Sequence, residues 1–200
     1  MSKARLEAFS DGVIAILITI MVLDLRTPAG VDWSALATAL PDLGTYLLSF
    51  VFLGIYWNNH HHLLHATSRI NGAVLWANLH LLFWLSLVPF ATRWMGQTDF
   101  ETIPVATYGV VLLLSAAAFT ILVRVILACQ PHESVLSAAI GTDTKGKLSL
   151  ALYATAIPLA LLNRWLAIAL YAFVALIWLV PDRRIEARLN ATRATDGSEQ

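Results

Sequence analysis

The sequence predicts an all-α membrane protein with six transmembrane helices. Of its 200 residues, 58% are hydrophobic and only 13% are charged, whereas a soluble domain of this size carries about 25% charged residues. We therefore expect one six-helix transmembrane domain over residues 1–181 and a polar cytoplasmic tail over residues 182–200. Six stretches are apolar and long enough to cross a bilayer or nearly so, namely 6–25, 43–65, 70–92, 103–128, 148–162 and 165–181.

The boundary between the last two stretches is the least regular part of this layout. A continuous apolar region carries Pro158, Asn163 and Arg164 in its middle. Proline and a charged residue are unfavourable inside one long membrane helix. We expect two short helices joined by a tight turn at residues 163–165.

The distribution of basic residues predicts the orientation, because cytoplasmic loops carry an excess of Lys and Arg. With six spans, ten basic residues fall on the side of both termini and three on the other side. This difference predicts that both termini are cytoplasmic, in a multi-pass protein of the plasma membrane. The ten are Lys3, Arg5, Arg69, Arg124, Lys145, Lys147, Arg183, Arg184, Arg188 and Arg193, and the three are Arg26, Arg93 and Arg164.

The first apolar stretch carries a narrow stripe of aliphatic residues. At about 100° per residue, Ile16, Thr19, Ile20 and Leu23 lie on one face of a helix about 100° wide. Asp11 falls about 140° away from Ile16, on the reverse side. An aliphatic stripe on a membrane helix is most often a packing or lipid-facing surface. An ionisable residue inside the membrane is by contrast a candidate functional residue.

The start of this helix, Arg5-x-x-x-Phe9-Ser10-Asp11, resembles the signature of the transmembrane protein 175 family of potassium channels. The resemblance covers the six-segment layout, although only the first helix matches closely in residue type. It implies a homotetramer in which the first helices line a central pore for potassium ions. It also implies that no re-entrant selectivity-filter loop exists, and the sequence contains no TVGYG-type motif.

The same resemblance assigns roles to the stripe. Ile16, five positions after the motif aspartate, matches the narrowest hydrophobic ring. Thr19 matches a threonine implicated in selectivity, and Ile20 and Leu23 match further hydrophobic rings. Four isoleucines around an axis would gate by dewetting, and threonine hydroxyls would give a moderate preference for potassium over sodium. Asp24, at the outer end of the helix, would concentrate cations at the mouth.

The polar residues behind the stripe are expected to form a structural network. A buried carboxylate is retained only when it is paired and hydrogen-bonded, so we expect Asp11 to meet Arg5, a histidine or an asparagine from neighbouring helices. The resemblance suggests that polar residues of the second and third helices bond to the Arg5–Asp11 segment. The predicted network is Arg5, Phe9, Ser10, Asp11, His61, His65, Asn78 and His80.

Two other functions stay open at this point. A proton-coupled secondary transporter could use Asp11 and the histidines of residues 56–65 as a relay, but it would normally show broken helices and an internal repeat. A membrane metalloenzyme needs more histidine ligands than the six present, although His61 and His65 could bind one zinc ion. We expect no cofactor, no resident metal, no catalytic residue and no nucleic-acid partner.

Overall fold

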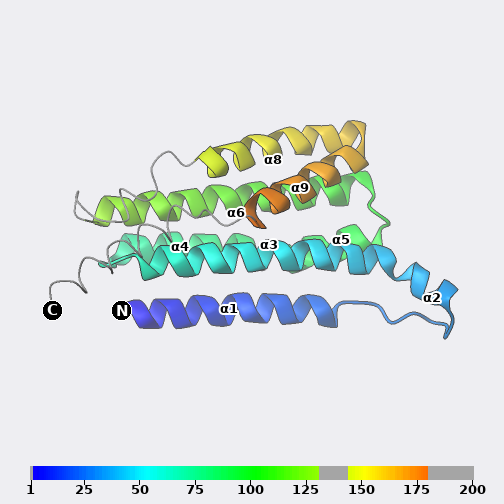
Figure 1. Ribbon diagram of the computed structural model, residues 1–200, viewed down its shortest axis with the longest axis horizontal. Helices are drawn as coiled ribbons and strands as arrows, with labels where there is room; N and C mark the ends of the chain where they lie inside the picture. Colours follow the sequence, from blue (N-terminus) through cyan, green and yellow to red (C-terminus); the bar gives the residue numbers. More distant parts are fainter. Residues whose placement is uncertain (1, 131–143, 180–200) are drawn as a thin grey trace, which may run out of the picture.

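The computed structural model describes residues 2–130 and 144–179, and every regular element in these ranges is an α-helix (Figure 1). The predicted tail, residues 182–200, lies outside the described residues. The helices are α1 (Lys3–Leu23), α2 (Trp33–Thr38), α3 (Leu40–His65), α4 (Gly72–Ser86), α5 (Val88–Gln97), α6 (Thr102–Cys129), α8 (Thr144–Leu162) and α9 (Arg164–Leu179).

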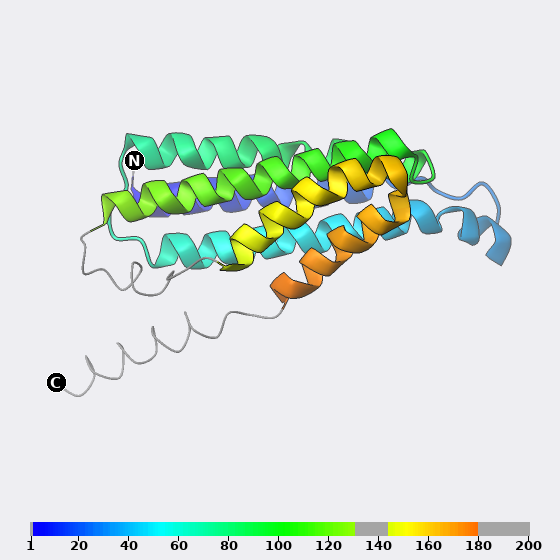
Figure 2. The same cartoon turned by 90° about the horizontal axis from the view of Figure 1, so that it is seen from above.

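The long helices lie side by side in one elongated bundle (Figures 1 and 2). Helix α1 forms one edge of the bundle and packs on α3, α4 and α5, while α6, α8 and α9 lie beyond them. Because its neighbours are all on one side, α1 presents the rest of its surface to the outside. We call the two ends of the bundle the Lys3 end, where α1 begins, and the Leu23 end, where it stops.

The predicted set of membrane helices is present. Among the described residues, five stretches are long and apolar enough to cross a bilayer, and α9, with 16 residues, is a shorter apolar helix. The five are Lys3–Leu23, Leu40–His65, Gly72–Gln97, Thr102–Cys129 and Thr144–Leu162.

The third predicted segment, 70–92, needs correction. It is two helices, α4 and α5, which separate at Leu87, and the second continues to Gln97. Pro89 in the first turn of α5 explains the break, because proline has no N–H to donate and its ring clashes with the preceding turn.

The predicted turn between the fifth and sixth segments is confirmed. Helix α8 ends at Leu162 and α9 begins at Arg164. The side chain of Asn163 stabilises the turn, since its Oδ1 accepts the backbone N–H of Trp165 at 3.0 Å. Such side-chain-to-backbone bonds are the reason that asparagine favours turns. The described part of α8, Thr144–Leu162, already includes residues before the predicted start at 148.

The short helix α2 was not predicted. Asp32 caps its N-terminus by accepting the N–H of Ala35 at 2.8 Å, as aspartate commonly does. The Ala35 amide, together with the hydroxyl of Ser34, holds the pKa of the Asp32 carboxyl below its usual value. The cap therefore orders the connection between α1 and α3 at the Leu23 end.

Candidate functional site

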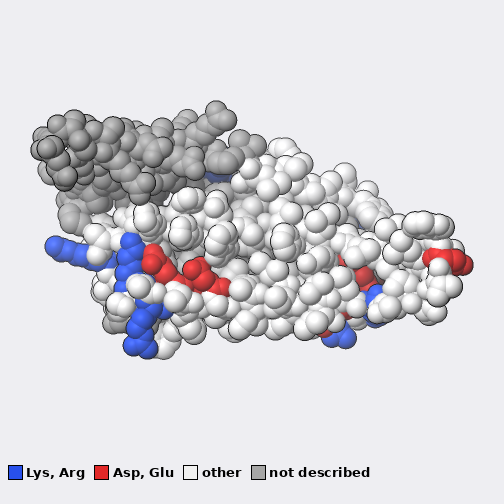
Figure 3. Space-filling model, turned by 60° about the horizontal axis from the view of Figure 1, so that its bottom comes forward, with Lys and Arg blue, Asp and Glu red and all other residues white. Residues whose placement is uncertain are grey.

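Helix α1 has one buried face and one open face. Leu6, Ser10, Ile14, Leu17 and Met21 are buried against the bundle. The predicted pore residues lie on the other face, where Ile16 is 57% exposed, Ile20 is 42% exposed, Leu23 is 83% exposed and Thr19 is also exposed. Figure 3 views the side on which α1 lies, and shows a broad uncharged band between two charged ends. The four predicted pore residues thus share an apolar surface that the subunit itself does not cover.

The hydroxyl of Thr19 is oriented by its own helix. It donates a hydrogen bond to the carbonyl oxygen of Ile16 at 2.9 Å. A hydroxyl has one proton and two lone pairs. Because the proton of Thr19 is donated to Ile16 O, its hydroxyl oxygen is left to accept hydrogen bonds or to contact a cation. This arrangement suits a partly hydrated cation better than an anion.

A buried hydrogen-bonded cluster lies behind α1 toward the Lys3 end. The Nδ2 of Asn78 on α4 donates to Ser10 Oγ at 2.9 Å, and the Oδ1 of Asn78 lies 2.7 Å from Nε2 of His60 on α3. Ser10 gives its only proton to Leu6 O at 2.9 Å, so it accepts from the amide. His60 then donates through Nε2. This Ser10 cluster joins α1, α3 and α4.

Asp11 points toward α3, away from the open stripe. Its Oδ1 accepts the indole N–H of Trp57 at 3.0 Å, and the residue is half-buried. We expected Arg5, a histidine or an asparagine as the partner of Asp11, but its hydrogen-bond partner is the indole of Trp57. Arg5 is exposed and forms no ion pair with any described residue, and Phe9 is 50% exposed.

The three histidines of the predicted network, His61, His65 and His80, do not belong to the Ser10 cluster. His61 is exposed and stacks between Trp57 and His65, with ring centroids 6.0 and 6.1 Å away. His80 accepts the indole N–H of Trp84 at 2.9 Å on the outer face of α4. Within the described residues none of the three bonds to the Arg5–Asp11 segment. Of the partners predicted from the second and third helices, only Asn78 bonds to this segment, through Ser10.

His60 was missed, although the sequence contains a signal for it. It lies seven residues after Leu53 and four before Leu64, two fully buried leucines of α3. Residues at these spacings share a helix face, whereas His61 is turned away by about 100°. Helical phase therefore distinguishes the buried histidine from its three neighbours.

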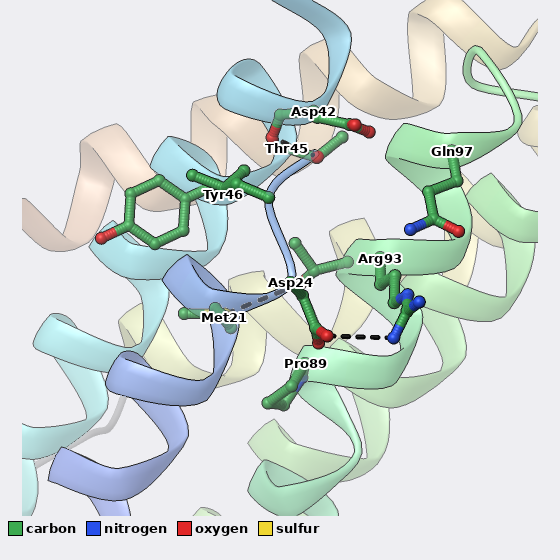
Figure 4. Close-up of a pocket in the computed structure, with 10 residues that line it drawn as sticks. Met21, Asp24, Asp42, Thr45, Tyr46, Pro89, Arg93 and Gln97 are labelled. Carbon is green, nitrogen blue, oxygen red and sulfur yellow. Dashed lines mark hydrogen bonds and ion pairs between the residues drawn. The ribbon is translucent and has the colours of Figure 1, made fainter. Parts of the chain in front are cut away.

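The predicted outer-mouth carboxylate is paired. Asp24 caps the C-terminus of α1 and lies 3.0 Å from the guanidinium Nη1 of Arg93 on α5 (Figure 4). A cation at this place also interacts favourably with the partial negative charge of the helix C-terminus. The small cavity beside the pair has a volume of about 20 Å³, about enough for one water molecule. Asp24, the residue expected to concentrate cations at the mouth, is thus ion-paired with Arg93.

A second buried cluster, not predicted from the sequence, lies toward the Leu23 end. Ser49 Oγ on α3 is 2.6 Å from Thr92 Oγ1 on α5 and 2.9 Å from the Tyr108 hydroxyl on α6. Thr92 also lies 3.9 Å from Met21 Sδ on α1. We call Ser49, Thr92 and Tyr108 the hydroxyl triad.

The described residues contain no group of three His, Cys, Asp or Glu side chains placed to hold a metal ion. Among the histidines of α3, His61 stacks on Trp57, and His60 bonds to Asn78. The chemistry that this part of the chain offers is therefore an apolar stripe with one hydroxyl, supported by buried hydrogen bonds.

Comparisons with known proteins agree with this geometry. The family profile described as "Endosomal/lysosomal potassium channel TMEM175" matches residues 5–89. A potassium channel of Chryseobacterium sp. is 52% identical over 189 residues, which cover 94% of this chain and 98% of that protein. The endosomal/lysosomal proton channel TMEM175 of Danio rerio is 38% identical over 96 residues, which cover 42% of this chain and 18% of that protein.

The fold matches a solved structure as well. The crystal structure of a lysosomal potassium-selective channel TMEM175 homologue from Chamaesiphon minutus superposes with a TM-score of 0.73 at 25% identity, over 89% of this chain and 96% of that chain. The identity to the Chryseobacterium protein, which extends over nearly the whole of both chains, shows that this multi-pass membrane protein belongs to the TMEM175 family of potassium channels, a family of ion channels and not of enzymes.

Proposed function

We propose that the protein is the subunit of a homotetrameric potassium channel whose pore is lined by the open face of α1. The observation that carries this proposal is the exposed stripe of Ile16, Thr19, Ile20 and Leu23 on a helix at the edge of the bundle. Four copies around an axis would cover this face and turn it into the wall of a conduit. The names of the bacterial relatives support potassium as the ion.

Ile16 is the proposed gate. Four isoleucine side chains at one level form a ring that excludes water when it is narrow, and an ion cannot pass without its hydration shell or replacement oxygens. A small dilation or rotation of α1 lets water enter. Ile20 and Leu23 repeat the same surface toward the Leu23 end, one and two turns further along.

Thr19 is the proposed selectivity residue. Its outward lone pairs, oriented by the bond to Ile16 O, replace part of the hydration shell of a passing cation. Single hydroxyl dipoles discriminate less than a cage of backbone carbonyls does. We therefore expect a moderate preference for potassium over sodium.

The proposed location is the plasma membrane with both termini in the cytoplasm. Lys3, Arg5 and Arg69 lie at the Lys3 end, whereas Arg93 and Arg164 lie at the Leu23 end. The excess of basic residues near the Lys3 end favours this orientation. Asp11 and His60 belong to separate hydrogen-bonded groups, so no observation favours the coupled proton relay of a transporter.

The proposed function is tested with purified full-length protein reconstituted into planar bilayers. With potassium on one side and sodium on the other, we expect a current whose reversal potential has the sign of a potassium-preferring pore and a size that corresponds to a moderate preference. Absence of current in verified tetramers would contradict the proposal. A flux that requires a proton gradient and stops in Asp11→Asn would identify a transporter instead.

A further inference from the structure

The hydroxyl triad connects three helices in the interior of the bundle. Ser49 and Tyr108 are fully buried and Thr92 is 5% exposed. Buried hydroxyls are costly unless they are hydrogen-bonded, and here each bonds to another across a helix boundary. Ser49 on α3 is the central member, in contact with Thr92 on α5 and Tyr108 on α6.

Because each hydroxyl has one proton to donate, the donor and the acceptor of every hydrogen bond in the triad can be assigned. The Thr92 hydroxyl lies 2.7 Å from the carbonyl oxygen of Val88 and donates its single proton there. Ser49 must then donate to Thr92, and Tyr108 must donate to Ser49. This series of hydrogen bonds ends at the carbonyl oxygen of Val88, the first residue of α5, directly after the break at Leu87. The triad therefore fixes the beginning of α5 to α3 and α6.

Helix α5 in turn contacts the Leu23 end of α1. Arg93, next to Thr92 in sequence, forms the ion pair with Asp24, and Thr92 itself contacts Met21. Met21 belongs to the buried face of α1, directly behind Ile20 and Leu23. Through these two contacts, a displacement of α5 would move the Leu23 end of α1, which belongs to the proposed pore wall.

We infer that the hydroxyl triad is a positioning device for the Leu23 half of the pore helix, in the same way that the Ser10 cluster supports the Lys3 half. Between the two, the buried residues of α1 are Ile14 and Leu17, and the partly buried Val13 and Ile18 pack against the same core. The two polar supports therefore bracket the level of Ile16. This inference rests on the proposed function, because it concerns the helix that is proposed to line the pore.

The chain offers matched controls for the triad. Ser115 on α6 is as fully buried as Ser49, but its hydroxyl has no hydrogen-bond partner in the described structure. Tyr153 on α8 is 3% exposed and makes no hydrogen bond with a described residue, although its ring packs on Phe52 at 6.3 Å. Ser115→Ala and Tyr153→Phe remove the same atoms as Ser49→Ala and Tyr108→Phe but leave the hydrogen bonds of the triad intact.

The first test is single-channel recording of full-length tetramers. We expect Ser49→Ala, Thr92→Val and Tyr108→Phe to change the ratio of open to closed time in the same direction. The change should be about fivefold in Tyr108→Phe, which removes one buried hydrogen bond, and at least as large in Ser49→Ala, which removes two. Thr92→Ser, which keeps the hydroxyl, should restore the ratio of the unmodified protein. Ser115→Ala and Tyr153→Phe should leave it unchanged.

The outcomes separate positioning from mere stability. If the three triad variants melt at lower temperature but gate like the unmodified channel, the triad only stabilises the fold and the inference is wrong. It is equally wrong if Ser115→Ala changes gating as much as Ser49→Ala does. Thr92→Ser and Tyr108→Phe are small changes that provide assembled protein even if Thr92→Val fails to fold.

A second measurement does not depend on ion conduction. A Leu23→Cys reporter, in a Cys129→Ser background, is labelled with a soluble maleimide. We expect the labelling rate to change by about twofold or more in Ser49→Ala and to stay constant in Ser115→Ala, because only Ser49→Ala removes hydrogen bonds that hold α1 in position. Equal rates in both would overturn the inference. A failure of the unmodified protein to conduct would instead count against the proposed function.

Discussion

The indole nitrogen of Trp57 lies 3.0 Å from Oδ1 of Asp11 and joins α3 to the start of α1. Asp11 is half-buried and Trp57 is 44% exposed, so water reaches this bond. The pair lies about 140° around the helix from the stripe at Ile16. Asp11 thus supports α1 from behind and is not placed to coordinate an ion in the proposed pore.

The Asp11 bond predicts a loss of stability without a change in selectivity. Asp11→Asn keeps an acceptor for the indole but removes the charge, so the free energy of unfolding should fall by only about 1 kcal/mol. Trp57→Phe removes the donor and should have an effect of similar size. Size-exclusion chromatography and thermal melting in detergent measure both changes, and reversal potentials should stay constant. A stable Asp11→Asn tetramer with altered selectivity would show that Asp11 faces the ions.

Ile16 predicts the largest effect on conduction. Ile16→Asn places four polar groups in the proposed constriction and favours water within it. Basal potassium conductance should rise about tenfold, which corresponds to a barrier lower by about 1.4 kcal/mol. The matched control is Ile16→Val, which keeps the ring apolar. Unchanged currents in assembled Ile16→Asn tetramers would remove this residue from the pore.

Thr19 predicts a change in selectivity at constant shape. Thr19→Val removes the hydroxyl that bonds to Ile16 O and keeps the side-chain volume. The permeability ratio of potassium to sodium should fall by about two- to fivefold, since a single hydrogen-bond acceptor per subunit is lost. Thr19→Ser retains the hydroxyl and should retain most of the preference. Identical reversal potentials for Thr19→Val and the unmodified channel would contradict the assignment.

The ion pair of Asp24 and Arg93 predicts a charge effect at the Leu23 end. Arg93→Gln frees the Asp24 carboxylate to attract cations, so single-channel potassium conductance should rise by about twofold at low ionic strength. The increase should disappear near 1 M salt, where the Debye length is about 3 Å. Arg26→Gln, which removes an arginine without an ion pair among the described residues, is the control. An increase that persists at high salt would indicate a displaced helix instead.

The helices and the open face of α1 could be predicted because both are local in origin. Apolar length and helical phase place Ile16, Thr19, Ile20 and Leu23 on one face. The turn at Asn163 follows from the chemistry of the asparagine side chain, whereas Pro158 lies inside α8 and does not end it. The break at Leu87 escaped prediction, although Pro89 is its cause, because proline is also common inside continuous membrane helices.

The buried partners could not be predicted because they depend on how the helices meet. A serine on a membrane helix can bond to its own backbone, as Ser86 does with the carbonyl of Phe83, or to another helix, as Ser49 does. Both look alike in sequence. The same applies to Asp11, for which an indole was as available as a histidine. Only the packing of α3, α4 and α5 against α1 distinguishes these alternatives.

The central claim, that the open face of α1 lines the ion pathway, is tested most directly by blocking that pathway chemically. Ile20→Cys lies on the stripe, whereas Ile18→Cys lies about 160° away from Ile16 around the helix; both are made in a Cys129→Ser background. A charged methanethiosulfonate reagent should abolish most of the potassium current through Ile20→Cys and leave the Ile18→Cys current unchanged. Block of Ile18→Cys with no effect on Ile20→Cys would show that this face of α1 does not line the pore.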